Sequence, residues 1–297
     1  QRVYGMNDVM KEVKKWNPAE VERVSGVPEA QVYEATKAMA DNRPGTFIWC
    51  MGGTQHTIGN NMTRASCILQ LALGNVGKEG GGANIFRGHD NVQGATDLGV
   101  LSDTLPGYYS LAEGAWKHWC KVWDLDFEWV KARFDQASYE EGKDMTPSMF
   151  LRGITVSRWI DGVLEEAGNI DQNDNIKVMV LWGHAPNSQT RMTEMKTAME
   201  KLETLVVIDP FPTVSAVLHD RTDGVYLLPA TTQFETRGSV TASNRSLQWR
   251  DQIMAPLFES KTDHEIITLF AKKFDFADRL LRNISMESEN VPMIEDI

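Results

Sequence analysis

The sequence predicts an α/β protein that contains parts of two doubly wound domains with mostly parallel sheets. Three observations support this fold class: apolar runs of strand length, helical patterns between them, and glycine-containing turns where runs end. The apolar runs lie at 45–51, 177–183, 204–210 and 225–229. Continuous apolar strands that alternate with helices are typical of parallel sheets whose two faces are both covered.

The first α/β pattern opens with helices that begin near Asn17 and Pro28, residue types that favour a helix start. The strand at 45–51 ends in a glycine pair, and a helix is expected over about 60–73. A strand, a glycine turn and a helix form the unit that places ligands at the carboxyl ends of strands.

The second α/β pattern includes a helix over about 190–202 between two strands. We expect residues 1–90 to be the C-terminal part of one α/β domain and residues 91–297 to be a second α/β domain. The second domain carries an aromatic-rich insertion at about 100–150. The density of aromatic residues there favours a local aromatic cluster over a base-stacking surface.

Composition limits the classes of function. The chain has 297 residues, 42% apolar and 24% charged, which is ordinary globular composition. Its net charge of -11 and the absence of a basic stripe exclude nucleic acid as a partner. The three cysteines, Cys50, Cys67 and Cys120, form no C-x-x-C pair and are expected to be reduced and mostly buried. We therefore predict no metal ligands in this chain.

The segment from Arg87 to Gly94 (RGHDNVQG) follows a glycine run and has no hydrophobic periodicity. Such a segment is unsuited to a core and well suited to gripping a small anion, because a guanidinium can hold a carboxylate through two parallel hydrogen bonds. His89, within this segment, and His56, after the first predicted strand, are either functional, as acid–base groups or ligands, or hydrogen-bonded structural histidines.

Other polar groups follow the predicted strands. The segment after the first strand, Met51 to His56, suits a nucleotide or cofactor tail or is a plain strand-to-helix turn. Asp209 ends another strand and either accepts hydrogen bonds from the N–H groups of a guanine or the hydroxyls of a ribose, or caps a helix. Farther on, Arg237 and Arg245 either face phosphates or belong to a solvated hairpin.

Taken together, these segments resemble the large (alpha) subunit of molybdopterin-dependent formate dehydrogenases, in the dimethyl-sulfoxide-reductase superfamily. The resemblance runs along nearly the whole chain, and the long arginine segment is its most specific part. The motifs that carry it are Met51–His56, Gly74–Lys78, Arg87–Gly99, Leu105–Tyr108, Trp182–Pro186, Val207–Pro210, Leu228–Ala230 and Thr262–Asp263.

The resemblance implies a bis-molybdopterin guanine dinucleotide cofactor that holds molybdenum or tungsten and oxidises formate to carbon dioxide, or performs the reverse reaction. By motif, Arg87 and His89 would be catalytic, with Arg87 holding the formate carboxylate. Residues 91–297 would be the second cofactor-binding domain. The cofactor-binding residues implied by the resemblance are Met51, Gly52, Gln55, Gln93, Gly183, His184, Ile208, Asp209 and Asp263.

The chain also departs from the family pattern. The cysteine motif for a [4Fe-4S] cluster, the cysteine or selenocysteine metal ligand and the C-terminal cofactor-binding domain are all missing. We therefore expect a middle segment of a catalytic subunit that is inactive alone. The cluster would be present in the assembly without being ligated by this chain.

The resemblance implies several partners: the remainder of the catalytic subunit, an iron–sulfur electron-transfer subunit and, as a further option, a cytochrome b membrane subunit. A histidine at position 89 resembles respiratory, periplasm-facing members, so the periplasmic side of the inner membrane is expected, with the cytoplasm as the alternative. Two other functions stay open. Asp209 to Thr213 also resembles periplasmic nitrate reductase, and the missing metal ligand would suit a non-catalytic scaffold or cofactor-carrying fragment.

Overall fold

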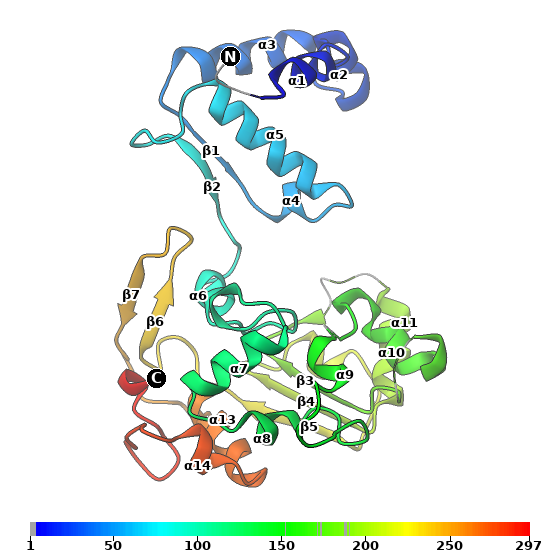
Figure 1. Ribbon diagram of the computed structural model, residues 1–297, viewed down its shortest axis with the longest axis vertical. Coiled ribbons are helices and arrows are strands. Elements are labelled where there is room, and N and C mark those ends of the chain that lie inside the picture. The colour runs from blue at the N-terminus through cyan, green and yellow to red at the C-terminus, as the bar shows by residue number, and fades with distance from the viewer. Residues whose placement is uncertain (1–3, 152, 171, 173, 187–188, 190) are drawn as a thin grey trace. The chain divides into compact units, whose positions relative to one another are not determined.

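The computed structural model describes residues 4–151, 153–170, 172, 174–186, 189 and 191–297. The chain divides into two compact units, unit 1 (Gln1–Val92) and unit 2 (Gln93–Ile297). Unit 1 runs from blue to cyan in Figure 1, and unit 2 runs from there to red. The division falls two residues after the boundary expected from the sequence, which lay between residues 90 and 91.

Unit 1 is a mainly helical body around one pair of strands. The strands are parallel, with Thr46 opposite Gly82 and Trp49 opposite Ile85. Asn17 caps a helix as predicted, because its side chain accepts a 3.0 Å hydrogen bond from the Glu20 N–H. The elements are α1 (Met6–Val13), α2 (Pro18–Ser25), α3 (Glu29–Asp41), β1 (Thr46–Trp49), α4 (Met51–Thr54), α5 (Gly59–Ala72) and β2 (Gly82–Ile85).

Unit 2 begins within α6 (Val92–Asp97) and contains a three-stranded sheet, a hairpin and the aromatic insertion (Figure 1). Its further helices are α7 (Glu113–Val122), α8 (Phe127–Lys131), α9 (Pro147–Phe150), α10 (Trp159–Leu164), α11 (Met192–Lys201), α12 (Val214–Val217), α13 (Asp263–Lys273) and α14 (Ala277–Leu280). Its strands are β3 (Val178–Trp182), β4 (Thr204–Asp209), β5 (Val225–Pro229), β6 (Gly238–Thr241) and β7 (Leu247–Arg250). Short 3-10 turns lie at Pro106–Tyr108, Val156–Arg158, Ala167–Asn169 and Ile294–Asp296.

The main sheet of unit 2 is parallel, in the order β3-β4-β5. Alternate residues of β4 enter two different cores. Leu205 packs in a cluster with Met195 and Met199 of α11, while Ile208 packs with Ile266 of α13. The prediction of a parallel sheet covered on both faces is therefore confirmed. The helix expected over 190–202 is α11, and its predicted first residue, Thr190, lies outside the described residues.

The aromatic insertion folds as a small core of its own. Trp116 of α7 packs with Met149 of α9, and its ring N–H donates to the Met149 carbonyl at 3.3 Å. The rings of Tyr109, Trp119 and Trp123 form a chain of aromatic contacts beside it. The predicted local aromatic cluster is confirmed.

The three cysteines are free, but their burial differs from the expectation. Cys120 is buried, Cys50 is half-buried and Cys67 is exposed, so the prediction of mostly buried thiols is wrong for Cys67. The reason lies in α5, whose buried positions are Gly59, Ser66 and Gln70 rather than its apolar residues. Among the described residues, no helix combines the length and apolar character needed to cross a membrane.

Candidate functional site

In unit 1, the predicted site residues gather at the carboxyl edge of the parallel pair β1–β2. After β1 the chain enters α4, which begins at Met51, and after β2 it enters the arginine segment. The Phe86 N–H donates to the Trp49 carbonyl at 3.1 Å, which extends the strand pairing to the residue before Arg87. The structure thus brings Arg87 to the edge from which Met51 and Gly52 emerge.

The side chains at this edge are accessible to a ligand. Arg87 is half-buried, whereas Met51, Gly52, Gln55 and His89 are exposed. Gly88 has φ +102°, a backbone conformation that favours glycine and turns the chain between Arg87 and His89. The arrangement is an open loop edge with one guanidinium, which can bind a small anion.

Close backbone approach shapes the turn between α4 and α5. A Cβ atom on Gly59 would lie 2.0 Å from the Thr54 carbonyl oxygen, so only glycine fits there. The His56 ring nitrogen Nε2 forms a 2.8 Å hydrogen bond with the Gly52 carbonyl. Of the two interpretations of His56, the structure favours the hydrogen-bonded structural histidine.

Gln93 belongs to unit 2, where its side chain is buried and engaged. Its amide donates to the Asp97 carboxylate at 2.9 Å and to the Tyr108 hydroxyl at 3.2 Å. Arg245 pairs with the same carboxylate at 3.5 Å. Gly99 lets the chain pass close to the Leu105 backbone. A Cβ atom at position 99 would lie 2.6 Å from the Leu105 carbonyl carbon.

In unit 2, a second set of predicted residues gathers at the carboxyl edge of β3-β4-β5. The Gly183 N–H, just after β3, donates to the Ile208 carbonyl at 2.8 Å. The Ser215 hydroxyl donates to the His184 carbonyl, so the loop after β3 is held against the start of α12. The Ile208 side chain is fully buried in the core. At this edge, Ile208 therefore contributes core packing and its backbone groups, and its side chain does not reach a ligand.

Asp263 reaches the same edge from the first position of α13. The Trp182 ring N–H at the end of β3 donates to its carboxylate at 2.7 Å across 81 residues of sequence. The neighbouring His264 is partly buried. Burial lowers the pKa of His264, although the Asp263 and Glu265 carboxylates act in the opposite direction.

A hollow of about 180 Å³ lies at the ends of β4 and β5. Asp209 contributes a carboxylate to it, and the remaining wall is largely apolar. The Phe211 N–H donates to this carboxylate at 3.3 Å. An apolar slot with one acceptor suits a planar heterocyclic ring that carries N–H donors. The other residues that line the hollow are Val207, Pro210, Phe211, Pro212, Leu227, Leu228 and Pro229.

The predicted alternatives for Arg237 are resolved by its partners. Its guanidinium lies 2.9 Å from the Glu295 carboxylate and 3.2 Å from the Glu287 carboxylate. An arginine held by two carboxylates has little attraction left for a phosphate. The segment forms the β6–β7 hairpin, so the hairpin interpretation is the correct one for Arg237.

Comparisons with known proteins agree with this architecture. A family model described as molybdopterin oxidoreductase matches residues 3–273. The F420-dependent formate dehydrogenase subunit alpha of Methanocaldococcus jannaschii is 30% identical over 283 residues, which are 95% of this chain and 37% of the relative. Formate dehydrogenase H of Escherichia coli is 27% identical, over 93% of this chain and 34% of the relative.

The nitrate-inducible formate dehydrogenase major subunit of Escherichia coli is 28% identical, over 88% of this chain and 29% of the relative. The chain thus spans about a third of the length of these relatives. Among solved structures, acetylene hydratase from Pelobacter acetylenicus has a similar fold, with a TM-score of 0.55 and 16% identity. That match covers 93% of this chain and 36% of the hydratase.

Proposed function

The chain belongs to the molybdopterin oxidoreductase family, and we propose that it is a segment of the catalytic subunit of a formate dehydrogenase. The observation that carries the proposal is the position of Arg87. It follows β2 at the same sheet edge at which Met51 and Gly52 follow β1. The fold thereby brings an anion-binding group beside residues suited to a cofactor tail.

Arg87 would bind the substrate. Its guanidinium can donate two parallel hydrogen bonds to the two oxygens of formate and fix the direction of the C–H bond. Oxidation of formate releases carbon dioxide, one proton and two electrons. The exposed imidazole of His89, two residues on, would hold the proton that is released.

The proposed cofactor is a bis-molybdopterin guanine dinucleotide with molybdenum or tungsten, and each unit, taken by itself, offers groups suited to a part of it. When bound, this cofactor would supply the two-electron redox chemistry. Met51, Gly52 and Gln55 offer exposed groups at the unit 1 edge. At the unit 2 edge, the hollow beside Asp209 accommodates a planar ring. The exposed residues that would flank it are Gly183, His184 and Asp263.

We propose that the remaining parts of the enzyme lie outside this segment. These are the rest of the catalytic subunit, with the metal ligand and a [4Fe-4S] cluster, and an iron–sulfur electron-transfer subunit. A cytochrome b membrane subunit would place the assembly on the periplasmic side of the inner membrane. Protease digestion of intact spheroplasts, with a cytoplasmic marker enzyme as the control, tests this location. Protection of the subunit together with the cytoplasmic marker would contradict it.

Replacement of Arg87 in the complete catalytic subunit tests the function. We expect Arg87→Ala to lower kcat/KM for formate by about 100-fold or more, because a charge-assisted bidentate contact is lost. Arg87→Lys should recover only part of the loss, since an ammonium cannot make the two parallel bonds. Steady-state formate oxidation and the molybdenum and tungsten content are the measurements.

Arg23→Ala is the matched control, because Arg23 is exposed and its ion-pair partner among the described residues is Glu20, within the same helix α2. It should leave both measurements unchanged. Unchanged formate oxidation in Arg87→Ala would remove Arg87 from the mechanism. A native assembly that contains neither molybdenum nor tungsten would instead support the scaffold interpretation.

A further inference from the structure

Unit 2 contains a cavity of about 650 Å³ whose lining includes none of the predicted site residues. Two segments far apart in sequence line it, Val122–Arg133 and Phe276–Asn283. Arg282 ties the two segments together. Its guanidinium pairs with the Asp124 carboxylate at 3.0 Å and donates to the Trp123 carbonyl. These contacts join the two walls of the cavity.

Two arginines in the cavity rest on one tryptophan ring. The guanidinium carbons of Arg133 and Arg279 lie 3.4 Å and 4.3 Å from the centre of the Trp129 ring. Arg133 also donates to the Trp129 carbonyl at 2.6 Å. A guanidinium that lies against an aromatic ring is held in place while its N–H edge stays available for a carboxylate.

These two cations differ from those arginines of the chain that carboxylates hold. Arg191 and Arg237 each pair with two carboxylates. Within the part of the chain that the structure describes, neither Arg133 nor Arg279 forms an ion pair. In a chain with net charge -11, this is a local concentration of unneutralised positive charge. Charge complementarity therefore selects an anionic partner.

Exposed apolar side chains surround the two arginines. Val122, Trp123 and Leu280 are 56%, 38% and 40% exposed. Beyond the cavity wall, the ring of Phe274 stacks on Phe276 and is 71% exposed. Tryptophan and arginine beside exposed apolar side chains are typical of the centre of a protein interface.

We propose that this Trp129 surface (Val122, Trp123, Trp129, Arg133, Arg279 and Leu280) binds an acidic segment of a separate polypeptide. Carboxylates of the segment pair with Arg133 and Arg279, and an apolar side chain of the segment packs on Trp123 and Leu280. The inference does not depend on the proposed reaction, because the surface shares no residue with either sheet edge.

Peptide binding to the complete catalytic subunit tests the chemistry. The probe is a fluorescein-labelled nonapeptide of alternating glutamate and leucine, and the matched probe has glutamine in place of glutamate. Fluorescence anisotropy should show binding of the glutamate peptide alone. Arg133→Gln and Arg279→Gln should each weaken it by about tenfold, because each removes a charge-assisted pair.

Two further variants sharpen the result. Arg23→Gln removes the same charge far from the surface in sequence and should not change binding. Leu280→Glu adds a negative charge to the surface without touching the Trp129 ring contacts, and should abolish binding. Absence of binding, equal binding of both peptides, or binding that both arginine variants retain overturns the proposal.

Cross-linking in the native assembly tests the source of the segment. Val122 is replaced by the photoreactive amino acid benzoyl-phenylalanine, and the cross-linked peptides are identified by mass spectrometry. A cross-link to an acidic segment of another polypeptide is expected. A cross-link within the catalytic polypeptide, to a segment without acidic residues, or to no polypeptide overturns the proposal.

Discussion

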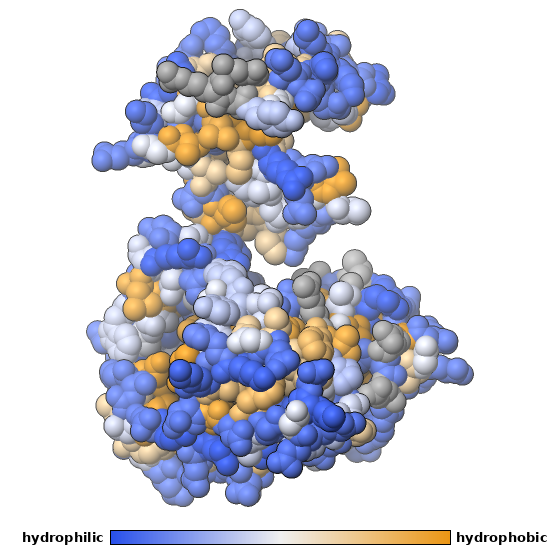
Figure 2. All heavy atoms as spheres, in the orientation of Figure 1, coloured by the Kyte–Doolittle hydropathy of each residue, from blue (hydrophilic) through white to orange (hydrophobic). Residues whose placement is uncertain are grey.

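The two units support their site edges in different ways. In unit 2, β4 is buried on both faces, and α11 and α13 cover it. In unit 1, none of the residues described in α1, α2 and α3 is buried. Its helix α5 buries Ser66 and Gln70 and leaves Ile68 and Leu71 exposed. Apolar side chains, orange in Figure 2, accordingly reach the surface of unit 1.

This difference shows that a specific sequence motif, here the arginine segment, need not lie in the part of the chain with the best-buried core. The arginine segment follows a sheet of two strands, and a sheet of that size depends on helix packing for its stability, which α5 provides here. The edge of unit 2 is held by its own bonds, such as that from Trp182 to Asp263. We infer that unit 1 contributes the anion-binding group while unit 2 contributes most of the folding free energy of the chain.

Truncation of one apolar strand residue in each unit, buried in β4 and exposed in β1, is the strongest test of this comparison. Leu205→Ala in β4 should lower the free energy of unfolding by about 4 kcal/mol, because it leaves a cavity in the main core. Ile48→Ala in β1 should cost less than about 1 kcal/mol, because Ile48 is 49% exposed. Urea unfolding of the 297-residue chain measures both. Equal costs would mean that β1 is packed as tightly as β4.

Much of the unit 2 framework was predictable because its strands are continuous apolar runs. Strand β5 matches its prediction at Val225–Pro229, and β4 ends one residue before the predicted end. Strand β2 was not predicted. It begins at Gly82 and has no apolar pattern, so its pairing with β1 depends on tertiary contacts.

The site was predictable in part. The edge positions of Met51, Gly183 and Asp209 follow from strand ends, which the apolar runs locate. Asp263 is different, because α13 was not predicted and its contact with Trp182 joins residues 81 positions apart. Only the family resemblance predicted a role for Asp263. The cation pair on Trp129 had no sequence signal either, since α8 and α14 meet only in the folded chain.

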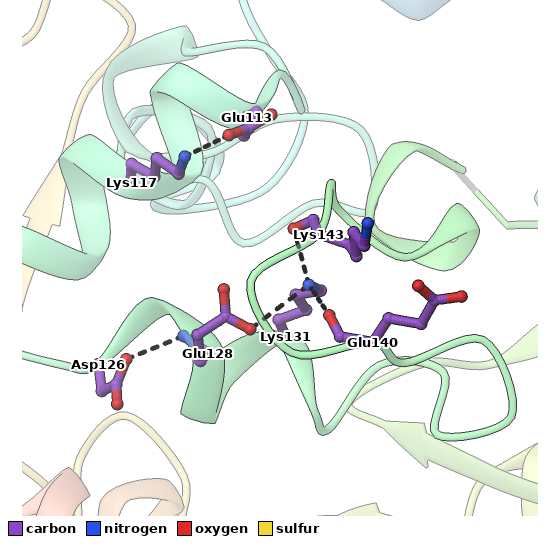
Figure 3. A network of polar contacts seen from close by, with 7 residues as sticks. All are labelled: Glu113, Lys117, Asp126, Glu128, Lys131, Glu140 and Lys143. Atoms are coloured by element: carbon purple, nitrogen blue, oxygen red, sulfur yellow. Dashed lines mark hydrogen bonds and ion pairs between the residues drawn. The ribbon is translucent and has the colours of Figure 1, made fainter.

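The two units also differ in whether they bury a charged side chain, and the effect expected from this difference is smaller. The ion pairs described in unit 1, such as Lys37 with Asp41, are exposed. In unit 2, the Lys131 side chain is fully buried, and Figure 3 shows its polar contacts. Its ammonium donates to the carbonyls of Glu140 and Lys143 and lies 3.4 Å from the Glu128 carboxylate. These hydrogen bonds hold the loop that contains Glu140 and Lys143 against α8.

Lys131→Met should lower the free energy of unfolding by about 3 kcal/mol, because methionine fills the space but leaves two carbonyls and a carboxylate without their donor. Lys117→Met is the matched control. Its exposed pair with Glu113, also drawn in Figure 3, should contribute only about 0.5 kcal/mol. Urea unfolding followed by tryptophan fluorescence compares the two. If both substitutions cost the same, the loop is held by its apolar contacts with Trp116 and Met149, and the buried ammonium contributes no more than a surface charge.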